Sequence, residues 1–486
     1  MTSTSESPAS LGRNLIEGRW QAAASGETIA CFNPSSGSQI GSAPASSAAD
    51  VDRAVSAARR SFESGAWTAR APNWRAQILQ KVAALIDQQA DEIAQLETRD
   101  NGMPITLARA LVATGAETFR YFSGWCTKIR GETVQISAPG DFHAYTLREP
   151  AGVAALITPW NVPFTMACNK IATALTAGCS AILKPAEETP LSALMLGDIL
   201  MQAGVPEGVI NIVCGRGNVA GAALAAHPDV DKISFTGSTD VGRKIVVAAA
   251  GNLKRVSLEL GGKSPVLVFP DADLDQAAAG IARGIFSNSG QACIAGSRIF
   301  VHQKIHDELA ARLAVIARQM KVGDGFEAGV NLGPLISQRQ LDRVSGLVAE
   351  GVRDGSQVIV GGNRPDRPGY FFEPTILTAP RPGARILREE IFGPVANLIP
   401  FTDIDDVVRQ ANDTQYGLAA AIWTRDIGIA HRLARRVKAG NIWLNCQLVV
   451  DRSMAFGGYK QSGWGRENGL EGLEAFLQTK SVYAAL

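Results

Sequence analysis

The chain of 486 residues is 46% hydrophobic and 19% charged, which predicts an ordinary globular protein of several domains and excludes a disordered one. Its 47 Lys and Arg nearly balance 46 Asp and Glu, so a formal charge of +1 leaves no broad basic surface for nucleic acid or acidic lipid. No uncharged apolar run reaches the ~20 residues that a membrane span needs.

The N-terminal sequence and the cysteine pattern bear on location and metal content. MTSTSESPASLGRN has no apolar stretch and a single Arg, so neither a signal peptide nor a transit peptide is predicted. Seven scattered cysteines, none in a CxxC pair, argue against a disulfide framework and a thiolate zinc site. Five histidines argue against a histidine-rich centre. We therefore expect a cytoplasmic protein without a metal ion.

The first third of the chain has a helical pattern. Apolar residues between Val51 and Phe62 recur at spacings of three and four, which predicts one helix, and longer helices are predicted over about 74–97 and 105–129. A short β-rich insert follows, in which strands near 133–137 and 143–148 flank Ala-Pro-Gly-Asp, a hairpin-type break.

From residue 153 onward, strand and helix patterns alternate. Helices between the strands, one of them with Thr189 as N-cap and Pro190 at its first position, indicate parallel sheets covered on both faces. The predicted strands are 153–158, 180–185, 209–215, 232–237 and 255–262, then 264–269, 297–302, 356–362, 419–424 and 440–445. The fold class is α/β, with two α/β domains and a small β element.

Two glycine-containing turns are candidate phosphate sites. Gly215, Gly217 and Ala220 fit the loose dinucleotide pattern G-x-G-x-x-G/A after a strand, although the acid usual at the end of the next strand is missing. Gly237 and Ser238 end another strand and lead into a helix, whose N-terminal N–H groups would hold a pyrophosphate. An ordinary tight turn between strand and helix is the alternative for each.

Lys184 and Glu187 lie just past a predicted parallel strand, at the edge where open sheets bind ligands. A carboxylate there can accept both hydroxyls of an adenosine ribose and repels a 2′-phosphate, which favours NAD over NADP. A surface Lys–Glu pair is the alternative.

Three side chains could carry out carbonyl chemistry. Cys293 lies in a loop of small residues that leaves room for a substrate carbonyl, whereas the other six cysteines are predicted to be core residues. Glu259 ends an apolar strand, where a buried acid is expensive unless it is paired or works as a base. Asn161, between two prolines, is either an oxyanion donor or a turn-forming residue. No histidine is an obvious partner for the thiol, which weakens a cysteine-hydrolase interpretation.

Eight segments, in the same order along the chain, resemble blocks of the aldehyde dehydrogenase superfamily, and the resemblance covers essentially the whole chain. The segments are ITPWNVPF, LKPAEETPLSAL, FTGSTDVG, LELGGKSP, GQACIAGSR, EEIFGPV, NDTQYGLAAAIWT and FGGYKQSGWGRE. The resemblance implies Cys293 as nucleophile, Glu259 as general base and Asn161 as oxyanion donor. The cofactor contacts it implies are Thr158, Trp160, Lys184, Glu187, Gly217, Gly237, Ser238, Glu390 and Phe392.

The resemblance also implies a domain plan and a reaction. It implies a Rossmann-like NAD-binding domain over 1–130 and 151–260, a catalytic domain over 261–465 and an oligomerisation element over 131–150 and 466–486. A homodimer or homotetramer is therefore expected. The implied reaction oxidises an aldehyde to the carboxylic acid with NAD, or alternatively NADP. It passes through a thiohemiacetal and a thioester on Cys293, and Glu259-activated water hydrolyses the thioester without transfer to coenzyme A.

The resemblance identifies the residues of the substrate pocket only approximately. Its predicted members are Val162, Met166, Asn169, Ile294, Gln447 and Phe456, with Ala292 and Leu448 as further candidates. This set lacks an acid and lacks the several Trp or Tyr residues that bind trimethylammonium groups, so it favours a medium-sized apolar or aromatic aldehyde. A semialdehyde is the alternative, with Arg452 as the group that would bind its carboxylate. A catalytically silent homologue and a cofactor-independent thiol esterase are the competing functions.

Overall fold

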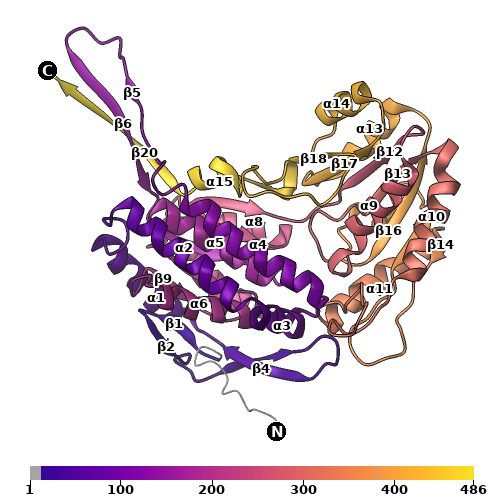
Figure 1. Ribbon diagram of the computed structural model, residues 1–486, viewed down its shortest axis with the longest axis horizontal. Coiled ribbons are helices and arrows are strands. Elements are labelled where there is room, and N and C mark those ends of the chain that lie inside the picture. Colours follow the sequence, from indigo (N-terminus) through magenta and orange to yellow (C-terminus); the bar gives the residue numbers. More distant parts are fainter. Residues whose placement is uncertain (1–11, 379) are drawn as a thin grey trace.

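The computed structural model describes residues 12–378 and 380–486, in which two open α/β sheets form two lobes (Figure 1). The first sheet has eight strands in the order β19-β11-β10-β7-β8-β9-β1-β2, and its five central strands are parallel. Its strands are β1 (Asn14–Ile16), β2 (Arg19–Gln21), β7 (Val153–Ile157), β8 (Ser180–Lys184), β9 (Ile210–Ile212), β10 (Lys232–Thr236), β11 (Arg255–Glu259) and β19 (Gly463–Trp464).

Helices cover both faces of this sheet because its strands are apolar on both faces. Along β7, Ala154 and Leu156 point into one core cluster while Val153 and Ala155 point into the other, as the alternation of a strand requires. The helices are α1 (Ala48–Glu63), α2 (Pro72–Gln88), α3 (Ala90–Asn101), α4 (Ile105–Ser123), α5 (Pro163–Ala177), α6 (Leu191–Ala203), α7 (Ala222–Ala226) and α8 (Thr239–Ala249).

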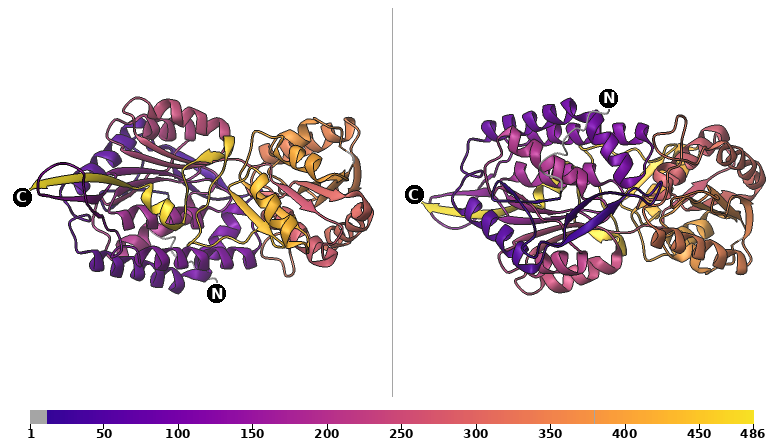
Figure 2. Two further views of the ribbon diagram at one scale, coloured as in Figure 1. Left: turned by 90° about the horizontal axis from the view of Figure 1, so that it is seen from above. Right: turned by 90° about the horizontal axis from the view of Figure 1, so that it is seen from below.

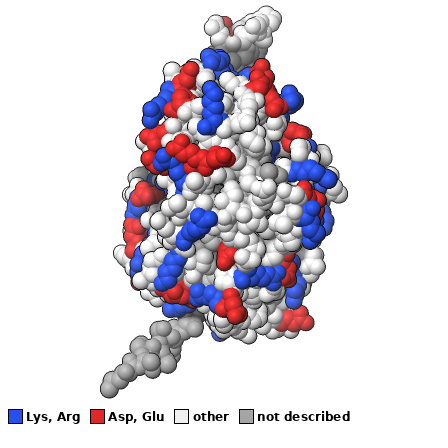
Figure 3. Space-filling model, turned by 90° about the vertical axis from the view of Figure 1, so that its right-hand side faces the viewer, with Lys and Arg blue, Asp and Glu red and all other residues white. Residues whose placement is uncertain are grey.

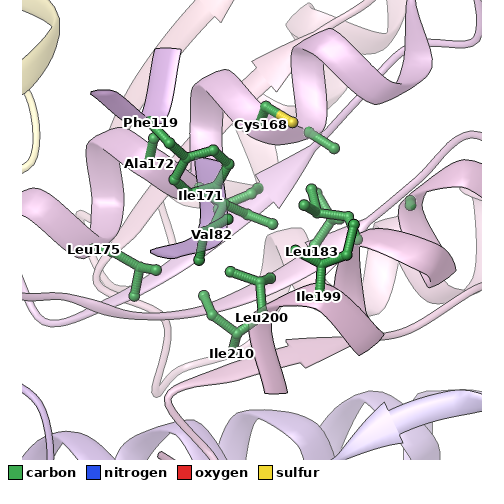
Figure 4. Packing of buried hydrophobic residues seen from close by; sticks show 14 of the residues in the cluster. Val82, Phe119, Cys168, Ile171, Ala172, Leu175, Leu183, Ile199, Leu200 and Ile210 are labelled. Carbon is green, nitrogen blue, oxygen red and sulfur yellow. The ribbon is translucent and has the colours of Figure 1, made fainter. Parts of the chain in front are cut away.

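The larger of these clusters is centred on α5, which is buried almost all round between β8 and helices α4 and α6. Figure 4 shows Phe119 of α4 and Ile171 of α5 within the same apolar core as Leu183 of β8 and Leu200 of α6. A fully buried helix of this kind cannot shift without opening a cavity in the core, which would cost about 2–5 kcal/mol per large side chain lost. The start of α5, next to Asn161, is therefore rigidly placed.

The second sheet has seven strands in the order β14-β15-β16-β13-β12-β17-β18. Its strands are β12 (Pro265–Val268), β13 (Arg298–His302), β14 (Gln357–Val360), β15 (Thr375–Thr378), β16 (Val395–Phe401), β17 (Ala419–Trp423) and β18 (Asn441–Leu444). The helices of this part are α9 (Leu274–Phe286), α10 (His306–Gln319), α11 (Gln338–Arg353), α12 (Arg385–Arg388), α13 (Ile404–Asn412) and α14 (Ile427–Arg436), and α15 (Gly469–Glu474) follows them in the chain. Val266 and Leu267 of β12 face opposite core clusters, so this sheet is also covered on both sides.

A third sheet, in the order β20-β6-β5, projects away from the lobes, as Figures 1 and 2 show. It consists of β5 (Thr133–Val134), β6 (Phe142–Pro150) and β20 (Leu477–Ala485), and β6 pairs with β20 over its whole length. Four large apolar side chains on it are exposed: Val134, Phe142, Leu147 and Tyr483. A two-stranded sheet of β3 (Thr28–Phe32) and β4 (Gln39–Pro44) lies apart from it.

The structure confirms the α/β class and the ten predicted strands from residue 153 onward, and it corrects several details. The prediction that the chain begins with helices is wrong, because β1 to β4 precede α1. The segment 74–97 is two helices separated at Gln89, and the next helix ends at Ser123, before residue 129. Thr189 is not an N-cap: α6 begins at Leu191 after Pro190, and the Thr189 hydroxyl donates to the Trp160 carbonyl at 3.3 Å. β15 and β16 were not predicted.

One boundary also differs from the predicted domain plan. Gly463 and Trp464 form β19, which pairs with β11 of the first sheet although the plan put them in the catalytic domain. The chain therefore returns to the first lobe before residue 465.

Basic and acidic side chains are interspersed over the face of the second lobe in Figure 3. Among the described residues, no helix combines the length and apolarity that crossing a membrane requires.

Candidate active site

A cleft of about 640 Å³ is lined by residues from both lobes. The first lobe contributes Trp160 and Asn161 after β7, Gly237 and Ser238 after β10, and Glu259 at the end of β11. These positions meet because β7, β10 and β11 are parallel, so their carboxyl ends share one edge of the sheet. The second lobe contributes Cys293, Glu390 and Phe392, and the cleft thus brings together the three predicted catalytic side chains.

Cys293 is the half-buried cysteine that lines this cleft. Burial raises the pKa of its thiol, and the nearby carboxyls of Glu390 and Glu259 raise it further. The sulfur is therefore held as a thiol at neutral pH until a proton is removed. The prediction that all six other cysteines are buried was wrong for one of them: five are buried, but Cys446 is half-buried.

Glu259 is the last residue of β11, and only 3% of it is exposed. Neither carboxyl oxygen has a hydrogen-bond partner among the described residues. Burial raises the pKa of this carboxyl well above its usual range, and the charge of Glu467 raises it further. An unpaired buried acid costs stability, and a raised pKa makes its ionised form a stronger base, so this arrangement suits a general base.

Asn161 is buried in the loop between β7 and α5 and is bonded to the loop that carries Cys293. Its side-chain Nδ2 donates to the Gln291 carbonyl at 2.8 Å, and its own carbonyl accepts from Asn288 Nδ2 at 2.8 Å. The amide lines the same cleft as the Cys293 sulfur. This fixed placement is what the predicted role of oxyanion donor requires.

The N-terminal end of helix α8 lines the cleft. Ser238 is the N-cap, and its hydroxyl accepts from the Val241 N–H at 3.3 Å. A side chain on Gly237 would lie 2.4 Å from the Phe235 ring, so only glycine leaves this turn open. Free N–H groups and the helix dipole at such an end favour an anion.

Glu390 and Phe392 line the cleft from the second lobe. Glu390 Oε1 accepts from the Gly262 N–H at 3.0 Å, and burial raises the pKa of this carboxyl to about 7. A side chain at Gly261 would lie 2.3 Å from Glu390 Oε2, so that glycine leaves space for the carboxylate. Phe392, at φ 56°, packs edge-on against the Trp160 ring with centroids 5.1 Å apart.

Three comparisons with known proteins agree with this geometry. Residues 20–482 match the profile of the aldehyde dehydrogenase family. The chain belongs to that family. It is 46% identical over 470 residues to aldehyde dehydrogenase 1 of Tanacetum cinerariifolium, covering 96% of this chain and 94% of that protein.

Two further members of the family are similar over nearly their whole length. The phenylacetaldehyde dehydrogenase of Pseudomonas fluorescens is 44% identical over 478 residues, which covers 97% of this chain and 95% of that protein. The NAD+ complex of the aldehyde dehydrogenase from Bacillus cereus superposes with a TM-score of 0.96 at 42% identity, covering 98% of this chain and 96% of that one. The protein is accordingly an oxidoreductase that acts on an aldehyde.

Four of the predicted cofactor residues of this aldehyde dehydrogenase lie outside the lining of the cleft. Glu187 Oε2 accepts from the Gly217 N–H at 2.6 Å, so the two predicted adenosine contacts are neighbours. Lys184 is buried and its ammonium donates to the Pro185 carbonyl at 2.9 Å. The Thr158 N–H donates to the Lys184 carbonyl at 3.1 Å. Gly217 begins a short π-helical turn, Gly217–Gly221.

The predicted substrate-pocket residues also lie outside the lining of this cleft. Val162, Met166, Ile294 and Phe456 are half-buried. Asn169 is buried and its amide donates to Glu467 Oε2 at 3.1 Å, within a separate cavity of about 10 Å³. Gln447 is buried where side chains on Gly284 and Gly296 would collide with its amide. The amide of Asn169 is thus already bonded within the protein.

Sequence reasoning missed polar residues of α11 that line the aldehyde dehydrogenase cleft. Gln340 Nε2 donates to the Phe392 carbonyl at 2.7 Å, and Arg343 donates to the Glu390 carbonyl at 2.8 Å. Both therefore hold the segment that carries Glu390 and Phe392. No sequence signal marks them, because the polar face of an amphipathic helix reads as solvent-exposed.

Proposed function

We propose that this chain oxidises an aldehyde to the carboxylic acid with NAD as the hydride acceptor. The observation that supports the proposal is the convergence of Cys293, Asn161 and Glu259, from three distant segments, on one cleft. A nucleophile, an oxyanion donor and a base are the groups that thioester chemistry on an aldehyde needs.

The residues around the cleft fit NAD. The α8 N-terminus with Gly237 and Ser238 would hold the pyrophosphate, and the Glu390 carboxylate would accept hydrogen bonds from the hydroxyls of the nicotinamide ribose. Trp160 and Phe392 lie close enough to form one aromatic wall. Thr158, Lys184, Glu187 and Gly217 would take the adenosine end, where the Glu187 carboxylate would repel a 2′-phosphate. When bound, NAD supplies the acceptor for the hydride.

The residues of the chain then act in sequence. The Cys293 thiol gives up its proton to water, the sulfur bonds to the aldehyde carbon, and the carbonyl oxygen takes the electron pair of the C=O bond. The Asn161 Nδ2 and the Cys293 backbone N–H stabilise this oxyanion. Loss of the hydride from carbon leaves a thioester. Glu259, when ionised, takes a proton from water, which attacks the thioester carbon and releases the acid and the Cys293 thiol.

The substrate we favour is a medium-sized apolar or aromatic aldehyde. Val162, Met166, Ile294 and Phe456 are predicted to contact it, and all four are apolar. A semialdehyde would need a free cation for its carboxylate, but Arg452 already donates to Asn468 Oδ1 at 3.1 Å and faces Glu467. The phenylacetaldehyde dehydrogenase named above acts, by its name, on a substrate of the favoured class.

Two further properties are proposed with the function. The projecting sheet of β5, β6 and β20 has exposed apolar side chains and an open edge, which a second subunit would cover in a homodimer or homotetramer. Sedimentation of the purified protein tests this directly, and a monomer at micromolar concentration would contradict it. A cytoplasmic location is proposed as well, because scattered free cysteines suit a reducing compartment.

The decisive experiment measures NADH and NADPH formation by the purified enzyme over aliphatic, aromatic and semialdehyde substrates. We expect aromatic or medium aliphatic aldehydes with NAD to give the highest kcat/KM. Absence of reduced cofactor with every aldehyde would support a silent homologue. Ester hydrolysis that exceeds aldehyde oxidation and does not depend on NAD would support a thiol esterase.

A further inference from the structure

Three consecutive residues with a left-handed backbone precede the loop of the nucleophile. Asn288 has φ 49° and ψ 37°, Ser289 has φ 55° and ψ 35°, and Gly290 has φ 69°. Glycine adopts this conformation freely and Asn tolerates it, but a run of such residues is unfavourable for L-amino acids. Strain of this kind persists only where the surroundings impose it, so each residue should have a partner that holds it.

Each of the three residues is held by a carbonyl or by a close approach. Asn288 Nδ2 donates to the Asn161 carbonyl at 2.8 Å, and Ser289 Oγ donates to the Gly333 carbonyl at 2.7 Å. At Gly290 any side chain would lie 2.1 Å from the Gly393 carbonyl oxygen. The turn is therefore held in place, and one of the groups that hold it is the backbone carbonyl of Asn161, the proposed oxyanion donor.

A second asparagine, in the first lobe, holds the same loop. Asn101, the last residue of α3, donates from Nδ2 to the Trp160 carbonyl at 2.8 Å and lies 3.4 Å from the Asn161 carbonyl. Asn101 is fully buried and Asn288 nearly so, which strengthens these bonds because water cannot replace them. The Asn161 loop is thus held by side-chain amides from both lobes.

The bonds between the Asn161 loop and the nucleophile loop run in both directions. Asn161 donates through Nδ2 to the Gln291 carbonyl, two residues before Cys293, while its carbonyl accepts from Asn288. Gln291 in turn accepts at Oε1 from the Ile336 N–H at 2.9 Å. Movement of Asn288 would therefore shift the donor and the nucleophile relative to each other.

We propose that Asn101 and Asn288 are positioning residues that fix the Asn161 amide relative to the Cys293 sulfur. This inference rests on the proposed role of Asn161 as the oxyanion donor. Neither asparagine lines the cleft, so neither acts on substrate or cofactor directly. A positioning error of about 1 Å can lower the rate about 10²-fold. The gain in rate from an accurate position can therefore outweigh the loss of stability that the strained turn causes.

The test uses Asn288→Gly, because glycine accepts the left-handed backbone while it removes the amide. We expect kcat to fall about tenfold to hundredfold, below the roughly 10²–10³-fold effect of removing an oxyanion donor, while KM for NAD stays within about twofold. Asn101→Ala, which keeps the helix, should lower kcat in the same way. The matched control is Asn211→Ala. Asn211, in β9 two strands away from β7, is also fully buried, and it makes bonds of 2.9 Å to Glu17 and Gly208.

A double-mutant cycle separates this inference from the proposed function. If Asn288 acts through Asn161, then Asn288→Gly should change kcat by less than about twofold in an Asn161→Ala background. The positioning role would be overturned by an unchanged kcat in Asn288→Gly or by an equal loss of kcat in both backgrounds. It would also be overturned if Asn211→Ala, at the same fall in melting temperature, lost as much kcat. Full activity of Asn161→Ala alone would instead overturn the oxyanion assignment itself.

Discussion

The two sides of Cys293 are built differently. The side proposed for the cofactor is a cleft of about 640 Å³ lined by charged groups such as Asp240, Arg343 and Glu390. On the side proposed for the aldehyde, the side chains are apolar and half-buried, and the Asn169 amide is bonded to Glu467. A charged, multi-part cofactor is bound by polar groups fixed at strand and helix ends, whereas an apolar aldehyde needs only shape. Selectivity for the aldehyde should therefore depend on packing.

The largest effect is expected at Cys293, the residue between the two sides. Cys293→Ala should abolish both the pre-steady-state burst of NADH and steady-state turnover, because no other cysteine lines the part of the cleft that the structure describes. Stopped-flow absorbance of NADH measures both. Binding of NAD should be retained, since the contacts proposed for it lie elsewhere. A burst of normal amplitude in Cys293→Ala would remove the covalent mechanism.

The next effect concerns the oxyanion donor. Asn161→Ala should lower kcat roughly 10²–10³-fold, the usual effect of removing one such donor. The amide is held at 2.8 Å from the Gln291 carbonyl, so it requires little reorganisation when charge develops on the substrate. Steady-state kinetics with a saturating aldehyde measures the loss. A change in KM alone would indicate that Asn161 only binds the substrate.

Glu259→Gln separates acylation from deacylation. We expect one equivalent of NADH in the burst, followed by turnover slowed about 10²-fold, because general-base catalysis contributes about 10²–10⁴-fold. Glu467→Gln is not a suitable control, since Glu467 forms a buried pair with Lys170 and its charge raises the pKa of Glu259. Glu188→Gln serves better, because that carboxylate pairs with Arg339 outside the cleft. Loss of the burst in Glu259→Gln would assign the residue to the first half-reaction instead.

The strands and the site residues that follow them could be predicted for one physical reason. Strands such as β7 and β12 are continuous apolar runs, and parallel strands bring their carboxyl ends to a common edge, so Asn161, Ser238 and Glu259 had to lie near one another. β1 has three residues and lacks the neighbouring helical pattern that marks the equally short β9, so no pattern identifies it. Pro400 within β16 reads as a break, although its strand is paired on both sides.

The residues that sequence reasoning missed act through tertiary contacts. Gln340 and Arg343 lie on an amphipathic helix whose polar face resembles a solvent-exposed one, and only the fold turns it toward the cleft. Asn288 has a left-handed backbone that no local pattern announces. Asn169 and Gln447 are predicted pocket members, but contacts with Glu467, Gly284 and Gly296 place both in the interior.

A smaller effect is expected at the adenosine end of the cofactor side. Glu187→Gln should improve kcat/KM with NADP relative to NAD by about tenfold, which corresponds to about 1.4 kcal/mol of repulsion removed. The Gly217 N–H can still bond the Gln side-chain oxygen, so the turn should persist. Kinetics with both cofactors measure the ratio, and Glu188→Gln should leave it unchanged. An unchanged ratio in Glu187→Gln would show that another group selects the cofactor.

The smallest expected effect is a pH dependence confined to the cofactor side. Burial raises the pKa of Glu390 to about 7, so the carboxylate that would bind the nicotinamide ribose becomes neutral as the pH falls through 7. If the ionised form is required, KM for NAD should rise about fivefold to tenfold between pH 8 and pH 6, since a group with this pKa is about nine-tenths protonated at pH 6. The KM for an apolar aldehyde should not follow this change, because the apolar residues proposed to surround it do not titrate. Glu390→Gln should remove the pH dependence and keep KM for NAD at a constant, raised value. A pH profile of KM that survives this substitution would place the titrating group elsewhere, and an equal rise for the aldehyde would mean that the two sides of Cys293 do not titrate separately.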